Sequence, residues 1–494
     1  MMAVVVQETR SFESIAFIRE RLSIDGRTLS MKLKRLTLQN FRCFEKLDID
    51  FHEQLTVLIA PNGAGKTTVL DAARVALSSF IKGIDVSSAR PHALANIIPD
   101  DVRLKKMPSG SMEPQKPSRI VADGILSMHE TDIMTWQAER KSVEGSTKMS
   151  RDQTYDHITS EARKLQQQSQ REQTSDSTEL PLILYQGTGR LWYQGRFTSK
   201  VDDKQLEQQM YSRIWGYEDC LTAKSGYKQF ENWYGWLFKS YRELQIATLE
   251  NPNIHNEQEL DRYKQSVEAV QRAVNEVTES VTGWKNLQYR QSQGQKLVME
   301  HDEQGFMPLD MLSDGLRNIV ILVADIAFRC VRLNPQYGKE ATGKTSGVVL
   351  IDEVDMFLHP AWQQRVIGSL QRAFPRLQLI VTTHSPQVLT TVSKESIRKL
   401  IIGEDGRARA EIPLMNSYGM ESQNTLQGIM DVDPQPPVAE KDDLDQLTTL
   451  VESGQYQSQK SQQLLKTLIE TLGGQHPQIL RLQRSIRRME ALKR

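Results

Sequence analysis

Residues Ala60–Thr67 read APNGAGKT and combine glycines, a lysine and a hydroxyl residue at fixed spacing. Glycines let backbone N–H groups close around phosphate oxygens, and a following helix N-terminus adds a favourable partial charge. In such a loop Lys66 would reach the β- and γ-phosphates, and the Thr67 hydroxyl would ligate Mg²⁺. We therefore expect ATP and Mg²⁺ to bind here, with the nucleotide contacted by Pro61, Asn62, Gly63, Ala64, Gly65, Lys66, Thr67 and Thr68.

The loop departs from the motif G-x-x-x-x-G-K-[ST] at its first position, where the chain has Ala60. Alanine fits if the backbone keeps a negative φ there, so we expect an intact loop. The apolar run Leu55–Ala60 predicts a strand before it. Apolar residues at helical spacing predict a helix after it, namely Leu70, Ala73, Leu77 and Ile81. A chance match in a glycine-containing turn is the competing interpretation, and the flanking strand and helix argue against it.

Two acidic residues end a second apolar run, Gly347–Glu353. Asp352 is suited to hold Mg²⁺ together with Thr67, since the metal neutralises charge in phosphoryl transfer. Glu353 could orient and deprotonate the attacking water as a general base. An ordinary surface acid pair is the alternative for these two residues taken alone.

Two further motifs carry polar groups that suit a phosphate. His384 follows the apolar run Leu377–Thr383, and its N–H could donate to the γ-phosphate; a structural histidine is the alternative. Ser313 and Gly315 open a predicted helix and offer a hydroxyl, backbone N–H groups and a positive helix end. A plain N-cap is the alternative for Ser313.

The order of these motifs resembles that of the ABC-type ATPase heads of the RecF/SMC/OLD class. The resemblance implies a homodimer that encloses ATP, in which Ser313 and Gly315 of one copy contact the ATP held by Lys66 of the other. It also implies that Asp355 contacts the nucleotide and that His384 acts as a catalytic switch beside Glu353.

The same resemblance, which covers about residues 32–413, supplies two further candidates. Gln186, at the end of LPLILY, is the candidate for a glutamine that links the metal to a helical lobe. Arg42, in NFRCF, matches an arginine that such heads place near the nucleotide. The fold class expected is α/β: an ABC-type P-loop ATPase head with a mixed sheet, a helical lobe without a long coiled coil, and a small all-helical C-terminal tail.

The domain boundaries in the 494 residues follow from the first predicted strand, which begins at Lys32, and from the span of the resemblance. We expect an N-terminal extension at 1–30, with Met31 as an alternative start, a head at 31–416 and a helical tail at 417–494. Within the head, a disordered loop is expected at about 142–179, where the chain is rich in Gln and Ser. A helical lobe is expected at about 200–285. Its aromatic residues lie at helical spacing, which favours core packing over a stacking platform for bases.

Charge and cysteine content narrow the function classes. Lys and Arg number 62, as do Asp and Glu, so overall charge does not predict nucleic-acid binding, although local patches leave it open. The three cysteines form no CxxC pair, which argues against a zinc knuckle or disulfide framework and fits a reducing compartment. No apolar run approaches the roughly 18–20 residues needed to span a membrane. We expect a cytoplasmic protein without a membrane partner.

The tail contains too little sequence for the Toprim nuclease domain of OLD proteins. Glu404, Asp431 and Asp433 imitate its acidic pattern, but Asp433 runs into PQPPV, which breaks a strand. The rest is predicted to be helical from the spacing of its apolar residues. We therefore expect no nuclease site in this chain.

The tail segments NSYGMESQNTLQGIMDV, ESGQY, LGGQHP and RRME resemble those of PtuA, the ATPase of Septu anti-phage systems that also occurs in retron defence operons. The resemblance implies a regulatory ATPase that gates a PtuB-like HNH nuclease, and head dimers that assemble into larger oligomers. In a retron, a reverse transcriptase and its RNA/DNA product would be further partners. The last helix is basic and favours docking onto a partner or another subunit, with a solvated face or nucleic-acid binding as alternatives.

Two other functions stay open at this stage. A RecF-type DNA repair clamp predicts salt-sensitive DNA binding that ATP promotes. An ATP-dependent nuclease in one chain predicts DNA cleavage that is lost on Asp431→Ala or Asp433→Ala. The residues of the ATP site suit both a fast ATPase and a slow, switch-like one, so the sequence predicts the activity without its rate.

Overall fold

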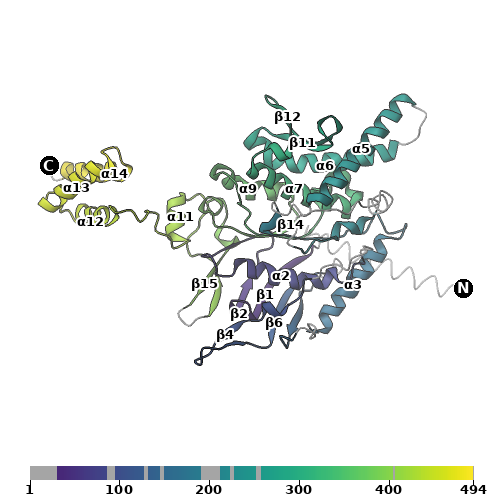
Figure 1. Cartoon of the computed structure of the whole chain (residues 1–494), viewed down its shortest axis with the longest axis horizontal. Coiled ribbons are helices and arrows are strands. Elements are labelled where there is room, and N and C mark those ends of the chain that lie inside the picture. The colour runs from purple at the N-terminus through teal and green to yellow at the C-terminus, as the bar shows by residue number, and fades with distance from the viewer. Residues whose placement is uncertain are drawn as a thin grey trace, which may run out of the picture. The chain divides into compact units, whose positions relative to one another are not determined.

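The computed structural model describes residues 30–85, 95–126, 132–144, 150–190, 212–222, 227–251, 257–403 and 407–492. The chain divides into two compact units, Met1–Ser422 and Gln423–Arg494 (Figure 1). The predicted extension lies outside the described residues, apart from its last residue. No helix in the described ranges is long and apolar enough to cross a membrane.

The first unit is built on a six-stranded sheet with the order β16-β15-β3-β14-β13-β9. Its strands are β3 (Leu55–Ile59), β9 (Leu182–Gln186), β13 (Gly347–Ile351), β14 (Leu377–Thr382), β15 (Ile397–Ile402) and β16 (Ala408–Glu411). Neighbouring strands are parallel except β15 and β16, which pair antiparallel, so the predicted mixed sheet is confirmed. The carboxyl ends of β3, β9, β13 and β14 therefore meet at one edge, where the predicted motifs follow the strands.

The sheet is covered on both faces, which explains why its strands read as continuous apolar runs. Figure 1 shows α2 (Lys66–Ile81) on one side of β14, and α7 (Asp314–Leu333) with α9 (Pro360–Ala373) on the other. Beyond α2 lies a five-stranded antiparallel sheet in the order β2-β1-β6-β7-β8. Its strands are β1 (Lys32–Phe41), β2 (Phe44–Asp50), β6 (Ser118–Ile125), β7 (Met134–Arg140) and β8 (Ser150–Arg151). The described part of the head also contains the short elements β4 (Leu104–Lys106), β5 (Met112–Pro114), α8 (Ala341–Lys344) and α10 (Pro386–Leu389), besides short 3-10 helices.

The helical lobe consists of α5 (Tyr227–Glu250) and α6 (Glu257–Thr282), followed by the small sheet β10 (Lys285–Arg290), β11 (Lys296–His301) and β12 (Gly305–Pro308). Phe230, Trp233 and Tyr234 of α5 are buried, and the ring centroids of Trp233 and Phe328 lie 4.8 Å apart. The aromatic face therefore packs into the core, as the helical spacing predicted. Both helices end too soon to form a long coiled coil, which confirms the predicted lobe.

The prediction of a disordered loop at about 142–179 is wrong, because α3 (Gln153–Ser169) lies within it. Tyr155, Ile158, Ala162 and Leu165 are buried at helical spacing, and α3 packs against α2. The Tyr155 hydroxyl lies 2.9 Å from the Ser78 hydroxyl of α2. The many Gln and Ser residues, of which Gln166 and Ser169 are themselves buried, made the segment look disordered and concealed the apolar stripe.

Replacing Ile158 by alanine tests this packing. We expect the free energy of unfolding to fall by about 2–4 kcal/mol, since a buried side chain is lost and a cavity remains. Chemical denaturation of the full chain measures the loss. Arg163→Ala, on the exposed face of the same helix, is the control and should change stability by less than about 0.5 kcal/mol. Equal stability of the two variants would contradict a packed α3.

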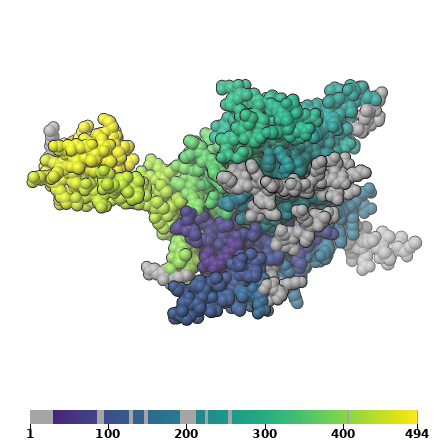
Figure 2. Space-filling model, in the orientation of Figure 1, coloured from purple at the N-terminus to yellow at the C-terminus, as the bar shows by residue number. Residues whose placement is uncertain are grey.

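The second unit confirms the predicted helical tail. It contains α12 (Lys441–Glu452), α13 (Gln459–Leu472) and α14 (Pro477–Leu492), and Figure 2 shows it, in yellow, as a compact body of its own. Leu444, Leu447, Val451, Leu468 and Ile479 form its apolar core. The helix α11 (Ser422–Gly428) lies at the boundary between the units. Asp431 and Asp433 follow α11 in a loop, and Glu404 lies outside the described residues.

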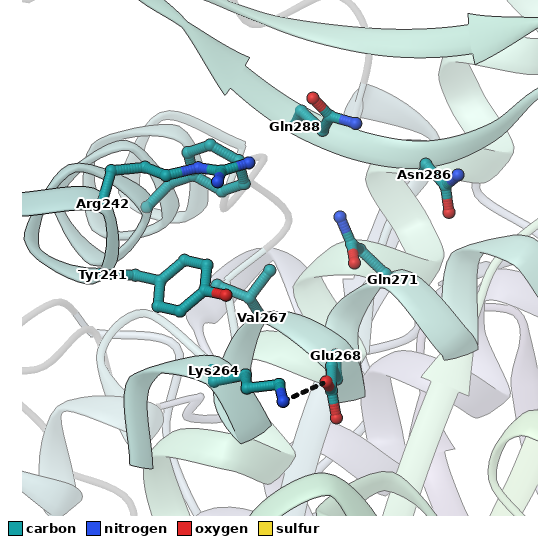
Figure 3. Close-up of a pocket in the computed structure, with 9 residues that line it drawn as sticks. Tyr241, Arg242, Lys264, Val267, Glu268, Gln271, Asn286 and Gln288 are labelled. Carbon is teal, nitrogen blue, oxygen red and sulfur yellow. Dashed lines mark ion pairs between the residues drawn. The ribbon is translucent and has the colours of Figure 1, made fainter. Parts of the chain in front are cut away.

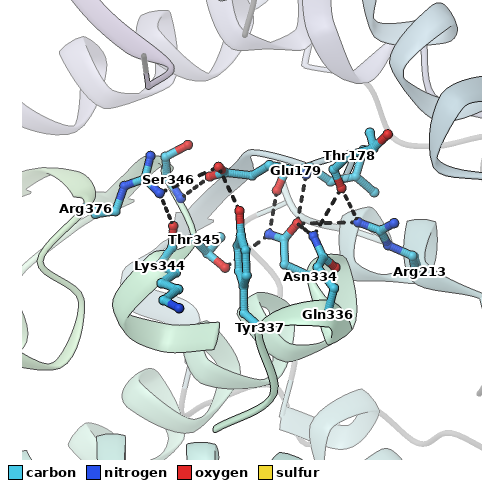
Figure 4. Close-up of polar contacts among 11 residues, drawn as sticks. Thr178, Glu179, Arg213, Asn334, Gln336, Tyr337, Lys344, Thr345, Ser346 and Arg376 are labelled. Carbon is cyan, nitrogen blue, oxygen red and sulfur yellow. Dashed lines mark hydrogen bonds and ion pairs between the residues drawn. The ribbon is translucent and has the colours of Figure 1, made fainter. Parts of the chain in front are cut away.

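A polar network connects the end of α7 to the segments that precede β9 and β13, at the amino ends of these strands (Figure 4). Asn334, just after α7, donates to the Leu180 carbonyl and the Thr345 hydroxyl, and it accepts from the Leu180 N–H. Arg213 donates to the carbonyl oxygens of Leu333, Ser175 and Thr178. This network holds the edge of the sheet opposite to the one where the predicted motifs meet.

Candidate nucleotide-binding site

The loop between β3 and α2 has the backbone that its glycines allow. Gly63 and Gly65 have φ angles of 79° and 95°, which other residues rarely adopt. Ala60 is not among the residues with positive φ, so the departure from the motif is tolerated as expected. A Cβ atom on Gly65 would lie 2.4 Å from the Phe44 ring, so the β1–β2 turn also requires glycine there.

The ammonium group of Lys66 is folded back over this loop. Its Nζ atom donates to the carbonyl oxygens of Ala60 at 2.9 Å and Pro61 at 3.3 Å. Burial lowers the pKa of Lys66, and the nearby carboxylates, of which Asp352 acts most strongly, oppose that shift. The loop carbonyls thus hold the Lys66 ammonium group at the place where the motif would bind a phosphate.

The two predicted metal ligands are in direct contact. The Thr67 hydroxyl donates to Oδ2 of Asp352 at 2.9 Å, and the hydroxyl of Thr382 donates to Oδ1 at 2.6 Å. Thr382 also accepts the Glu353 N–H at 2.7 Å. The buried Asp352 is therefore fixed from both sides. Thr382 escaped the sequence analysis because β14 lies between β3 and β13 only in the folded sheet.

The remaining polar candidates surround this pair. His384 follows β14, and burial, reinforced by the Lys66 ammonium, lowers the pKa of its imidazole. The carboxylates of Glu353, Asp355 and Asp352 act on the same imidazole in the opposite direction, so all four residues lie near it. Burial raises the pKa of Asp355, and its Oδ1 atom is buried without a hydrogen-bond partner. The structure thus brings Lys66, Asp352, Glu353, Asp355 and His384 together.

Two predicted residues are held elsewhere by other partners. The Gln186 amide is buried and donates to Asp325 of α7, so its side chain does not face Thr67. Its backbone carbonyl still accepts the Asp352 N–H at 2.9 Å. Arg42 is paired with Asp101 at 2.8 Å and with Asp71 of α2. The carboxylate partners of Gln186 and Arg42 lie far from them along the chain, so the motifs alone did not indicate these contacts.

Ser313 is the N-cap of its own helix, α7, which is the alternative that the sequence left open for this residue. Its hydroxyl accepts the Leu316 N–H at 3.4 Å. Gly315 lies against the turn after β13, since a Cβ atom there would be 2.4 Å from the Phe357 carbonyl oxygen. Within one copy of the chain, the start of α7 therefore contacts the segment that carries Glu353 and Asp355.

A hollow lies on the lobe and is lined by none of the predicted site residues. It encloses about 280 Å³ among α5, α6 and β10 (Figure 3). Several of its polar groups are already engaged: Lys264 lies 4.0 Å from Glu268, and the Gln271 amide donates to the Leu287 carbonyl at 3.0 Å. The cluster at the carboxyl edge of the sheet is therefore the better candidate site.

The glycine loop, its lysine and the Thr67–Asp352 contact at the end of a parallel sheet define the class of P-loop nucleotide-binding proteins. The chain belongs to the AAA ATPase domain family, whose model matches residues 31–389. It is 25% identical to the Retron Vc95 probable ATPase of Vibrio cholerae, over 88% of this chain and 87% of that protein. It is 33% identical to the Septu protein PtuA of Bacillus mycoides, over 24% of this chain and 16% of that protein. The predicted resemblance to retron and Septu ATPases is thus confirmed.

Among solved structures, the chain is similar to an SMC head bound to the C-winged helix domain of ScpA. The sequences are 14% identical, the match covers 77% of this chain and 97% of the other, and the TM-score is 0.44.

Proposed function

We propose that the chain binds ATP with Mg²⁺ at the loop and hydrolyses it. The contact between Thr67 and Asp352 carries this proposal, because it joins the hydroxyl that ends the loop to a carboxylate from another strand. A hydroxyl and a carboxylate are hard oxygen ligands of the kind that Mg²⁺ takes, so Thr67 and Asp352 fit the metal. Bound there, Mg²⁺ would neutralise negative charge on the phosphates.

The other residues then have separate roles. Lys66 binds the phosphates in place of its own loop carbonyls, since an ammonium ion prefers a charged acceptor. Glu353 orients the attacking water and accepts its proton. His384 donates an N–H to the terminal phosphate. The residues from Asn62 to Thr68, in the loop that Pro61 opens, supply the backbone N–H groups around the other phosphates.

We further propose that two copies complete the site. The N-terminus of α7, with Ser313 and Gly315, would meet the ATP held by Lys66 of the other copy, so that ATP links the copies. Asp355, with its unsatisfied carboxylate oxygen, would gain a partner at this junction. Arg42 and Gln186 would reach the nucleotide only after leaving their present carboxylate partners. Dimers of this kind would assemble into larger oligomers.

We also propose a place in anti-phage defence, which the names of the retron and Septu relatives support. In this proposal the chain gates a PtuB-like HNH nuclease. The nuclease site then belongs to the partner and not to this chain, which acts in the cytoplasm as a slow, switch-like ATPase. A retron setting would add a reverse transcriptase and its RNA/DNA product as partners, with nucleic acid as a further ligand.

The tail offers the test of the partner. Arg481, Arg484, Arg487 and Arg488 are exposed on α14, so we expect the double variant Arg484→Glu and Arg488→Glu to lose an HNH nuclease that co-purifies with the wild type. Co-expression of the chain with a PtuB-like HNH nuclease, followed by purification through a tag on the chain, measures this. The matched control reverses two exposed lysines of α13, Lys460 and Lys466, and should retain the nuclease. Retention by both variants would count against docking through α14.

A further inference from the structure

The turn after β13 has an uncommon backbone at both ends. Glu353 has a φ of 49° and Phe357 a φ of 64°, and both are non-glycine residues in the left-handed region. Such conformations persist only where surrounding contacts hold them in place. The turn carries Glu353 and Asp355, so whatever holds it also sets the direction of the proposed general base.

Arg190 holds the start of this turn together with Thr382, which accepts the Glu353 N–H. The Nη1 atom of Arg190 donates to the Asp352 carbonyl at 2.8 Å, and its Nη2 atom donates to the Glu353 carbonyl at 2.7 Å. The side chain is 2% exposed, and burial lowers its pKa to about 10, so it stays charged at neutral pH. The planar guanidinium uses three separate nitrogens, one for each carbonyl and one for Asn318, whereas the single ammonium nitrogen of a lysine cannot reach all three acceptors from one place.

Asn318 of α7 continues the connection. It accepts from Nε of Arg190 at 2.8 Å and donates to the Met356 carbonyl at 2.9 Å. Gly315, one helical turn earlier, packs against the Phe357 carbonyl. The turn is thus held at Asp352 and Glu353 by Arg190, and at Met356 and Phe357 by the first turns of α7.

We propose that Arg190 and Asn318 are positioning residues for hydrolysis, which couple the start of α7 to the orientation of Glu353. This inference rests on the proposed ATPase function. When a second copy docks on Ser313 and Gly315, a shift of α7 reaches Glu353 through Asn318 and Arg190. The general base is therefore aligned by the same helix that would contact the other copy's ATP.

Arg190→Lys tests the proposal, with Arg213→Lys as a matched control. Arg213 also donates to three backbone carbonyls, but at the opposite edge of the sheet. We expect Arg190→Lys to bind ATP with a Kd within about threefold of the wild type. Its kcat should fall at least about tenfold with KM little changed, because a misplaced Glu353 lowers transition-state stabilisation without weakening substrate binding. Arg213→Lys should keep kcat within about twofold. Steady-state kinetics, nucleotide titration and a thermal melt of each full-length variant provide the measurements.

Wild-type kcat in Arg190→Lys, or an equal loss of kcat in Arg213→Lys, would overturn the proposal. If Arg190→Lys does not melt cooperatively, Asn318→Asp tests the same coupling. This variant keeps an acceptor for Arg190 and loses the N–H donor to the Met356 carbonyl. Asn318→Asp should lower kcat at least about tenfold without a matching change in Kd, and unchanged kcat would reject the coupling. A wild type that binds no ATP would instead refute the proposed function itself, and a wild type that binds ATP without hydrolysing it would refute the hydrolytic role and this inference together.

Discussion

Replacing Lys66 by alanine is expected to remove ATP binding and, with it, hydrolysis. The ammonium group donates to two carbonyl oxygens of its own loop and is partly buried beside three carboxylates. Truncating one member of a buried, hydrogen-bonded charge pair costs about 2–5 kcal/mol. The Kd for ATP should therefore rise at least about 30-fold. Titration with ATP and Mg²⁺, followed by calorimetry or a fluorescent nucleotide, measures the change.

A matched control separates loss of binding from loss of fold. Lys46 lies on β2, and its side chain is 65% exposed, so Lys46→Ala should leave both the Kd and the melting temperature unchanged. Lys66→Ala should also melt close to the wild type without ligand, because Lys66 bonds only to carbonyls that water can reach once the side chain is gone. ATP should raise the melting temperature of the wild type and not that of Lys66→Ala. An equal Kd in wild type and Lys66→Ala would reject the loop as the nucleotide site.

The sequence predicted those parts of the site whose determinants are close together along the chain. The loop before α2 is recognisable because Gly63, Gly65, Lys66 and Thr67 lie within a few residues, and the glycines adopt the φ angles for which the motif selects them. The buried strands were predictable for a related reason. A strand covered on both faces must be apolar throughout, as Gly347–Ile351 is.

The parts that were missed depend on contacts between distant segments. Arg190 follows a strand in a loop without a distinctive pattern, and its role appears only when β9 and β13 pair and bring the Asp352 carbonyl to it. Thr382 acts on Asp352 because β14 lies beside β13. The one available signal was a hydroxyl residue near the end of an apolar run, which is too common to single out a site. Gln186 was placed correctly at a strand end, but the partner of its side chain, Asp325, could not be read from spacing.

Replacing Glu353 by glutamine is expected to separate ATP binding from hydrolysis. The change keeps the size of the side chain and leaves the backbone bonds of Glu353 to Arg190 and Thr382 in place. The Kd for ATP should stay within about threefold of the wild type. Without a general base, kcat should fall by about 100- to 10,000-fold. Single-turnover hydrolysis and nucleotide titration on the same sample distinguish the two effects.

The same variant should also reveal the assembly that ATP supports. If ATP joins two copies through Lys66 of one and Ser313 of the other, blocked hydrolysis should keep the copies together as long as ATP is bound. Size-exclusion chromatography with light scattering should then show Glu353→Gln as a stable dimer or larger assembly in ATP and Mg²⁺. Glu113→Gln, the same chemical change at an exposed position on β5, should behave as the wild type. Normal hydrolysis by Glu353→Gln would reject Glu353 as the base. Slow hydrolysis without ATP-dependent assembly would keep the base but reject the shared site, because only a nucleotide held by both copies can link them.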